Sequence, residues 1–150
     1  MTTTHEHDAT SAASRLREDH RNFARIFADI CERAGSGAWR DLDEVWRAFT
    51  ADVEARLAFE EHELFPGFSA QSPTCQALAQ RLAREHTQIR RSLDVLGLQI
   101  QLKEIRAVSI EAFIELLRSH AELEARRLYP WIAPAPVVAR APRERPRNAW

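Results

Sequence analysis

Apolar residues recur along most of this chain at intervals of three and four positions, the spacing that places side chains on one face of an α-helix. Four such stretches follow one another, with turn-forming residues between them. No stretch of useful length alternates apolar and polar positions, so the pattern does not predict a β-sheet. The chain is therefore predicted to be all-α, and at 150 residues it is expected to form one four-helix bundle in which the first and second helices, and the third and fourth, run antiparallel.

The boundaries of the four helices are predicted from glycine, proline and capping residues. Gly35-Ser36-Gly37 is expected to end the first helix, and Pro66-Gly67 to stop the second, which leaves 67–73 as the central connection. Ser72 is expected to cap the third helix, and the boundary between the third and fourth falls within 102–108. The predicted helices cover approximately residues 14–35, 41–65, 72–102 and 109–132.

The two ends of the chain differ from this pattern. Residues 1–13 are small and polar, and residues 133–150 alternate proline with arginine, so both are predicted to be disordered tails that flank a bundle over 14–132. The C-terminal tail carries a charge of +3, which leaves about −4 for the rest of the chain. Because this short tail has almost no interleaved aromatic residues, a solvated tail is favoured over a nucleic-acid-binding segment.

The composition limits the partners and the cellular location that can be expected for this protein. The net charge is −1, so no overall field favours nucleic acid or a membrane surface. No apolar run is long enough for a membrane span, and no signal peptide is visible at the N-terminus. Cys31 and Cys75 have no motif spacing, which favours a reducing compartment, and both are expected to be small buried residues. A cytoplasmic location is the resulting prediction.

The chain also contains an internal repeat that carries polar residues. His120 and Glu124 are four positions apart in the last predicted helix, so they share one face. Their segment, HAELEARRLYP, is a near copy of RLAFEEHELFP in the second helix, where Glu60 takes the place of Glu124. One helix upstream of each copy, a histidine lies on the apolar stripe: His20 before the first copy and His86 before the second. The repeat therefore brings imidazoles and carboxylates to similar depth in the bundle.

These inward polar residues favour a metal site. Buried carboxylates and imidazoles are costly unless they are paired or bind a metal ion, and this mixture of nitrogen and oxygen ligands suits iron, manganese or zinc. Any one of the histidines alone would more often be an ordinary core histidine, and this alternative stays open. Because the polar residues recur at matching positions in the two copies of the repeat, a metal site is favoured over unrelated core histidines. The predicted ligands are His20, Glu60, His86, His120 and Glu124.

The order of these residues, with LFP and LYP closing the second and fourth helices, resembles that of the hemerythrin-like (HHE cation-binding) family over about residues 14–132. The resemblance implies a left-handed, up-down-up-down four-helix bundle around a non-haem di-iron site. It further implies that Glu60 and Glu124 bridge the irons, that His86 and His120 serve one iron, and that His20 serves the other. Members of the family bind dioxygen, sense oxygen or iron, handle nitric oxide or peroxide, or repair iron centres.

Arg56 departs from the family pattern, which would place a histidine four positions before Glu60. Arginine stays protonated and has no lone pair for a metal ion. It could pair with Glu60 or Glu63, replacing one metal ion with a salt bridge. It could turn outward, so that water or Glu63 completes the site, or it could face the open coordination position and bind an anion such as peroxide. A di-metal site weakened on the His20 side is the favoured interpretation.

Three functions are consistent with this sequence. The first is a non-haem iron protein, with zinc or manganese as other metals, that binds, senses or detoxifies O2, NO or peroxide. The second is catalase- or peroxidase-like turnover at the same centre. The third is a metal-poor bundle, locked by salt bridges of Arg56, that acts through protein partners.

Two other residues near the predicted site are expected to have ordinary structural roles. His62, about 120° around the helix from Arg56, is expected at the surface, and Tyr129 is expected to pack in the core.

Overall fold

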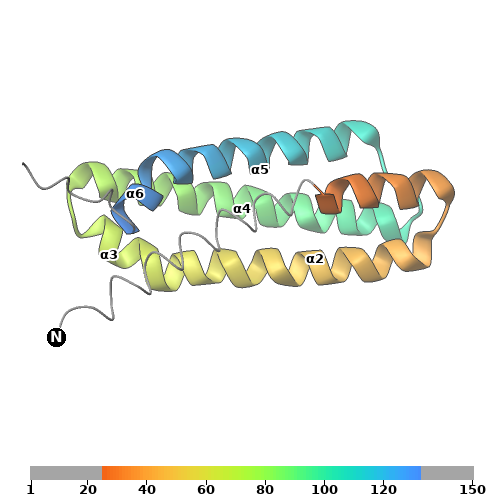
Figure 1. Ribbon diagram of the computed structural model, residues 1–150, viewed down its shortest axis with the longest axis horizontal. Coiled ribbons are helices and arrows are strands. Elements are labelled where there is room, and N and C mark those ends of the chain that lie inside the picture. The colour runs from red at the N-terminus through yellow and green to blue at the C-terminus, as the bar shows by residue number, and fades with distance from the viewer. Residues whose placement is uncertain (1–24, 133–150) are drawn as a thin grey trace, which may run out of the picture.

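A computed structural model describes residues 25–132, and every regular element within this range is helical. The long helices run antiparallel to their neighbours in the chain, as a four-helix bundle requires (Figure 1). The all-α fold class is therefore confirmed, whereas the predictions for His20 and for the two tails lie outside the described residues. In chain order the elements are a first helix over residues 25–36, α2 (Trp39–Phe59), the π-helix η1 (Glu60–Leu64), α3 (Phe65–Ser69), α4 (Pro73–Gln101), α5 (Ala107–Arg127) and α6 (Tyr129–Ile132).

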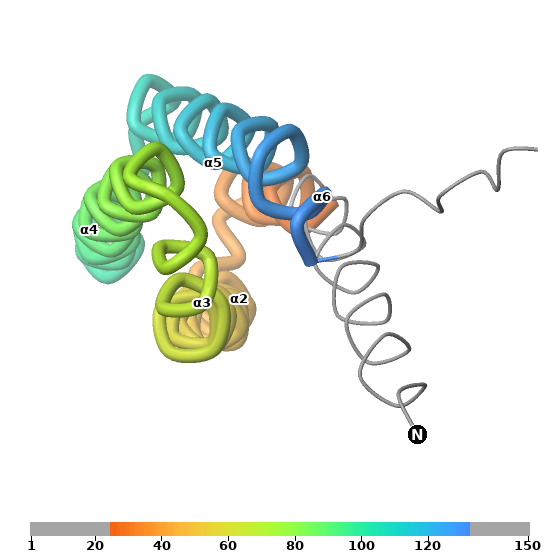
Figure 2. The backbone as a smooth tube through the Cα atoms, turned by 90° about the vertical axis from the view of Figure 1, so that its left-hand side faces the viewer, coloured from red at the N-terminus to blue at the C-terminus, as the bar shows by residue number. Residues whose placement is uncertain are grey.

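Helix α4 lies beside both α2 and α5, while the first helix lies between α2 and α5 on the other side of the bundle (Figure 2). The helical stripes predicted from the sequence face inward. Every apolar member of the stripe expected in the second helix is buried, from Leu42 to Leu64. The apolar spacing thus determines which face of each helix packs against the others.

The buried apolar residues form two clusters along the bundle. The first, called the central cluster, contains T-shaped contacts of Phe27 with Phe49 and Phe113, whose ring centroids lie 5.2 and 5.3 Å away. The second, called the end cluster, packs α3 and α6 against α4, with Leu82 and Tyr129 fully enclosed. Buried members of the central cluster are Phe27, Ile30, Leu42, Trp46, Phe49, Val53, Leu57, Ile89, Leu93, Leu96, Ile100, Ile110 and Phe113.

The prediction that Pro66-Gly67 stops the second helix is wrong. The backbone passes from α2 through η1 into α3 and remains helical to Ser69. Proline is tolerated because it closely follows the π-helix η1, where the usual hydrogen bonds between residues four apart, to which proline cannot donate, are already interrupted. The central connection is therefore only residues 70–72, shorter than the expected 67–73.

Other predicted boundaries agree closely with the structure. Ser72 caps α4 by accepting a hydrogen bond of 3.1 Å from the backbone N–H of Cys75, and the turn after α4 falls in the predicted window. Helix α5 begins two residues earlier than expected, at Ala107, and the last predicted helix is interrupted at Leu128 before α6. The connections are short enough to keep successive helices antiparallel.

Both cysteines lie nearer the surface than the sequence predicts. Cys31 is exposed and Cys75 is half-buried, so the expectation that both are buried is wrong, and neither forms a disulfide. Between residues 25 and 132, no helix combines the length and the apolar character needed to cross a bilayer.

Candidate metal centre

A layer of polar side chains separates the central cluster from the end cluster. Glu60, His86 and Glu124 have no exposed surface, and His120 is 2% exposed. On α4, for example, His86 lies between Ile89 of the central cluster and the end cluster's Leu82. Ionisable groups enclosed by apolar layers on both sides need a compensating partner, because hydration is lost.

The four buried residues direct their donor atoms at one another. Nε2 of His86 lies 2.9 Å from Oε2 of Glu60, and Nε2 of His120 lies 2.5 Å from Oε1 of Glu124. Across the site, His86 Nε2 to Glu124 Oε1 and His120 Nε2 to Glu60 Oε2 both measure 4.0 Å. One ligand atom from each residue falls within 4.8 Å of all the others. Two imidazole nitrogens and two carboxylate oxygens therefore converge on one small volume.

The orientation of these groups is not that of a hydrogen-bonded network. Within the described part of the chain, Nε2 of His86, Nε2 of His120 and both carboxylate oxygens of Glu60 have no partner with hydrogen-bond geometry. Polar atoms this deeply buried are nearly always satisfied by a neighbour, by water or by an ion. Ligand atoms that aim at a shared point, and not along one another's N–H bonds, fit a metal ion with mixed nitrogen and oxygen ligands.

The π-helix positions the first of these carboxylates. In η1 the N–H of Phe65 donates to the carbonyl of Glu60, five residues earlier, where an α-helix would use a spacing of four. A π-helix has more residues per turn than an α-helix, so successive side chains are separated by a smaller angle. Glu60 can therefore face the core while the adjacent Glu61, which is only partly buried, reaches the side of His86 on α4.

The carboxylates also hold protons on the histidines of the metal-free protein. Burial alone would lower the pKa of His86, but the nearby carboxylates of Glu124 and Glu60 raise it to about 9. Burial opposes the charged form of His120 as well, yet the negative charge of Glu124 raises that pKa to about 12. A metal ion entering this site would have to displace these protons.

The pKa values of the two buried carboxylates, Glu60 and Glu124, shift in opposite directions. Burial and then the charge of Glu124 raise the pKa of Glu60, whereas the adjacent His120 holds the pKa of Glu124 low despite complete burial. The Tyr129 hydroxyl donates a hydrogen bond of 3.1 Å to Oε2 of Glu124, and burial raises the pKa of that phenol, so it remains a donor. The core position of Tyr129 was predicted, and its bond to Glu124 gives it a second role.

Two further carboxylates near the histidines were missed from the sequence. Glu61 Oε1 lies 2.9 Å from Nδ1 of His86, and Oε2 of Glu85 lies 3.7 Å from Nδ1 of His120. Glu61 lies within the first copy of the repeat, but the matching position in the second copy is Ala125, and neither glutamate belongs to an apolar stripe. The only signal in the sequence was adjacency, since Glu61 follows Glu60 and Glu85 precedes His86.

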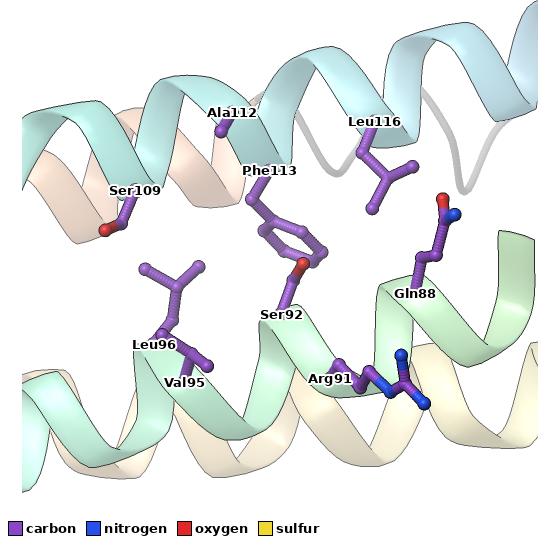
Figure 3. A pocket seen from close by; sticks show the side chains of 9 residues that line it. All are labelled: Gln88, Arg91, Ser92, Val95, Leu96, Ser109, Ala112, Phe113 and Leu116. Carbon is purple, nitrogen blue, oxygen red and sulfur yellow. The ribbon is translucent and has the colours of Figure 1, made fainter.

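The remaining predicted site residues occupy distinct environments. Arg56 is buried, at 8% exposure, one turn before Glu60, and its positive charge acts to lower the pKa of Tyr129. Glu63 and His62 are exposed on η1, as was expected for His62. A groove of about 430 Å³ between α4 and α5 is lined by residues that include Gln88 and Phe113 (Figure 3), and it contains none of the four converging ligands.

Comparison with known proteins agrees with this arrangement. The family model described as Hemerythrin HHE cation binding domain matches residues 11–132, which is most of the chain. The chain belongs to the hemerythrin HHE cation-binding family. Among curated proteins and among solved structures, none matches it. Membership of a cation-binding family and a buried cluster of four ligand residues together support metal binding.

Proposed function

We propose that this chain is a non-haem iron protein that binds a small ligand such as O2, NO or peroxide at the buried layer. The observation that carries the proposal is the convergence of two imidazole nitrogens and two carboxylate oxygens within 4.8 Å, between two apolar clusters. Imidazole with carboxylate is a ligand set that iron shares with zinc and manganese. Bound iron would supply redox-active coordination chemistry at this position.

One tightly held ion and a weaker second position are the proposed arrangement. Glu60, His86, His120 and Glu124 offer a full set of ligands for one ion. A second ion would lie on the side of Arg56, whose buried guanidinium stands one turn before Glu60. Because two cations at close range repel one another strongly where water is excluded, Arg56 is expected to weaken the second position.

The surrounding residues of this chain would shape the chemistry. The apolar clusters exclude water from the layer, which strengthens electrostatic interactions there. The Tyr129 hydroxyl bonds Glu124 and fixes the orientation of its carboxylate. Because the layer is buried between two apolar clusters, it favours small neutral ligands over bulky or charged ones. These features support binding of a diatomic gas or peroxide.

The test is anaerobic loading with Fe(II), followed by exposure to NO, to O2 or to peroxide, with visible absorption as the measurement. The wild-type protein is expected to develop new bands with at least one of these ligands, and the same protein loaded with zinc is expected to develop none. A variant with glutamine at both His86 and His120 serves as the matched control. Iron-loaded wild-type protein whose spectrum matches that of the control after all three ligands would overturn the proposal.

A metal-poor bundle that acts through protein partners is the second candidate, and the burial of Arg56 one helical turn before Glu60 favours it. In the metal-free protein, protonated His86 and His120 can balance Glu60 and Glu124, so the bundle can fold without an ion. Iron loading separates the candidates: this second function requires that the wild-type protein retain no more iron than the double-glutamine control. Catalase- or peroxidase-like turnover stays a prediction, measured as peroxide consumption above that of free iron.

A further inference from the structure

Nδ1 of His86, the ring nitrogen that faces away from the centre of the polar layer, is bound by Glu61, which is not one of the four converging ligands. Nδ1 of His86 lies 2.9 Å from Oε1 of Glu61, with geometry that makes a hydrogen bond. An ionised carboxylate can only accept, so the Nδ1–H of His86 is the donor. This bond fixes both the tautomer and the plane of the ring, and it leaves Nε2 as the atom that faces Glu60 and the centre of the layer.

Arg90 holds Glu61 from the solvent side. Its two terminal nitrogens donate to Oε1 and Oε2 of Glu61 over 2.7 and 3.2 Å, and its Nε lies within 3.2 Å of both carboxylate oxygens of Glu54. Arg90 lies one helical turn after His86 on α4, while Glu54 is on α2 and Glu61 on η1. The guanidinium thus links α4 to both α2 and η1 at the level of the polar layer. Its two parallel hydrogen bonds to Glu61 have the paired geometry that gives arginine–carboxylate contacts their specificity.

His120 provides a contrast within the same site. Its Nδ1 lies 3.7 Å from Oε2 of Glu85, and neither atom has a partner with hydrogen-bond geometry among the described residues. His86 is further restrained by Phe65, whose ring stacks on the imidazole at a centroid distance of 5.2 Å. His86 is therefore the more firmly oriented histidine of the pair.

We propose that Glu61, held by Arg90, is a positioning residue that orients His86 and makes it a stronger electron donor to the bound metal ion. This inference rests on the proposed function, because it concerns the metal bound at the four converging ligands. A carboxylate that accepts the outer N–H of a ligating histidine increases the basicity of the inner nitrogen. A more basic ligand stabilises Fe(III) relative to Fe(II), so Glu61 should lower the midpoint potential of the bound iron.

The experiment compares wild-type protein with Glu61→Gln, Glu61→Ala and Glu61→Asp. Cobalt(II) affinity is measured by competition with a chelator, and the Fe(III)/Fe(II) midpoint potential by spectroelectrochemical titration. Loss of a carboxylate that supports a metal ligand typically weakens metal binding by roughly 10–100-fold, so Glu61→Ala should approach the upper figure and Glu61→Gln the lower. Both should raise the potential. Glu61→Asp, which keeps the charge on a shorter side chain, should recover part of the affinity.

A matched control is available on the exposed face of α5. Glu115→Gln removes an exposed carboxylate that pairs with Arg118 at 2.6 Å on α5, away from the layer. It should leave both cobalt affinity and potential unchanged. Arg90→Met should give a smaller loss of affinity than Glu61→Ala, because Glu61 stays in place but is less firmly held.

The outcomes separate the two proposals. If the wild-type protein binds cobalt and iron while the Glu61 variants bind within twofold of it and keep its potential, the role of Glu61 is wrong and the metal site stands. If Glu115→Gln changes affinity as much as Glu61→Gln does, the effect is a general consequence of charge and the positioning role is also wrong. Wild-type protein that binds neither metal would overturn both proposals.

Discussion

Nε2 of His86 and Oε2 of Glu60 lie 2.9 Å apart in the interior of the bundle, yet their orientation does not form a hydrogen bond. Two buried polar groups at this separation would normally turn to share a proton along the N–H axis. Here the helices fix both side chains so that they point toward a common centre with His120 and Glu124. Such a geometry favours coordination of an ion over pairing between side chains.

Arg56→His is expected to strengthen the second metal position. The substitution removes a buried positive charge one turn before Glu60 and adds a nitrogen ligand at the same place. Iron content measured per chain should rise above that of the wild-type protein. Arg56→Leu is the control, because it removes the charge without adding a ligand, and it should give a smaller increase. Equal iron content in the wild-type and Arg56→His proteins would show that Arg56 does not limit the second position.

Glu60→Gln is expected to change stability and metal binding in opposite directions. Burial and the neighbouring Glu124 raise the pKa of Glu60, so its ionised form is costly in the metal-free fold. At about pH 9 and above, where His86 has lost the proton that ionised Glu60 balances, a neutral amide of the same shape should stabilise the metal-free protein by about 1 kcal/mol, within the range of single stabilising substitutions. Urea unfolding measures this change, and cobalt titration should show weaker binding. A variant that is both less stable and equally able to bind cobalt would contradict the expectation.

The stability of the metal-free protein should fall as the pH rises above neutrality. The pKa of His86 is raised from 6.5 to about 9 in the folded state, so its stabilising contribution is complete below about pH 6.5 and is lost as the pH rises through 9. A shift of this size corresponds to on the order of 3 kcal/mol. His120 acts in the same direction, with a folded pKa of about 12.

Urea unfolding between pH 6 and 10 measures this dependence, with zinc-loaded protein as the control. Metal-bound imidazoles carry no proton at the coordinating nitrogen, so the loaded protein should not show the same decline over this range. Metal-free protein whose stability is constant or increases from pH 6.5 to 9 would rule out protonated histidines as the source of charge balance.

Gly97→Ala is expected to destabilise the fold, although alanine is the better helix former. A Cβ atom at Gly97 on α4 would lie 3.0 Å from Nε1 of Trp46, which is packed in the central cluster on α2. Because Trp46 is 5% exposed and enclosed, it cannot move away freely. Overpacking should cost at least about 1 kcal/mol. Thermal unfolding measures it, and a variant that melts above the wild-type protein would show that the two helices can separate to admit the methyl group.

The apolar spacing was sufficient to predict the number, order and inward faces of the helices. It succeeds because burial of a helix face requires apolar residues at intervals of three and four, whatever the neighbours are. The same spacing places Glu60, His86, His120 and Glu124 on inward faces, and the structure brings their donor atoms together. Their role as metal ligands stays a prediction, and His20 lies outside the described residues.

The local distortion at the site could not be predicted from the same periodicity. Regular helical spacing separates Glu60 from Glu61 by about 100°, which assigns them to different faces. The π-helix reduces this angle, and it also allows the chain to continue through Pro66. A proline inside an otherwise helical pattern predicts the end of a helix, although it can equally accompany an irregular turn. The contacts of Glu61 with His86 and Arg90 depend on that turn and on how α4 packs beside it.

Metal content per chain, measured by elemental analysis on protein produced with iron present and without a metal-binding tag, tests metal binding at the buried layer most directly. The wild-type protein should retain about one iron per chain or more, and the variant with glutamine at both His86 and His120 should retain almost none, since metal affinity depends on the ligands present. Helical content by circular dichroism confirms that the variant is folded. Wild-type protein without iron, or equal iron in both proteins, would contradict a metal centre at this layer.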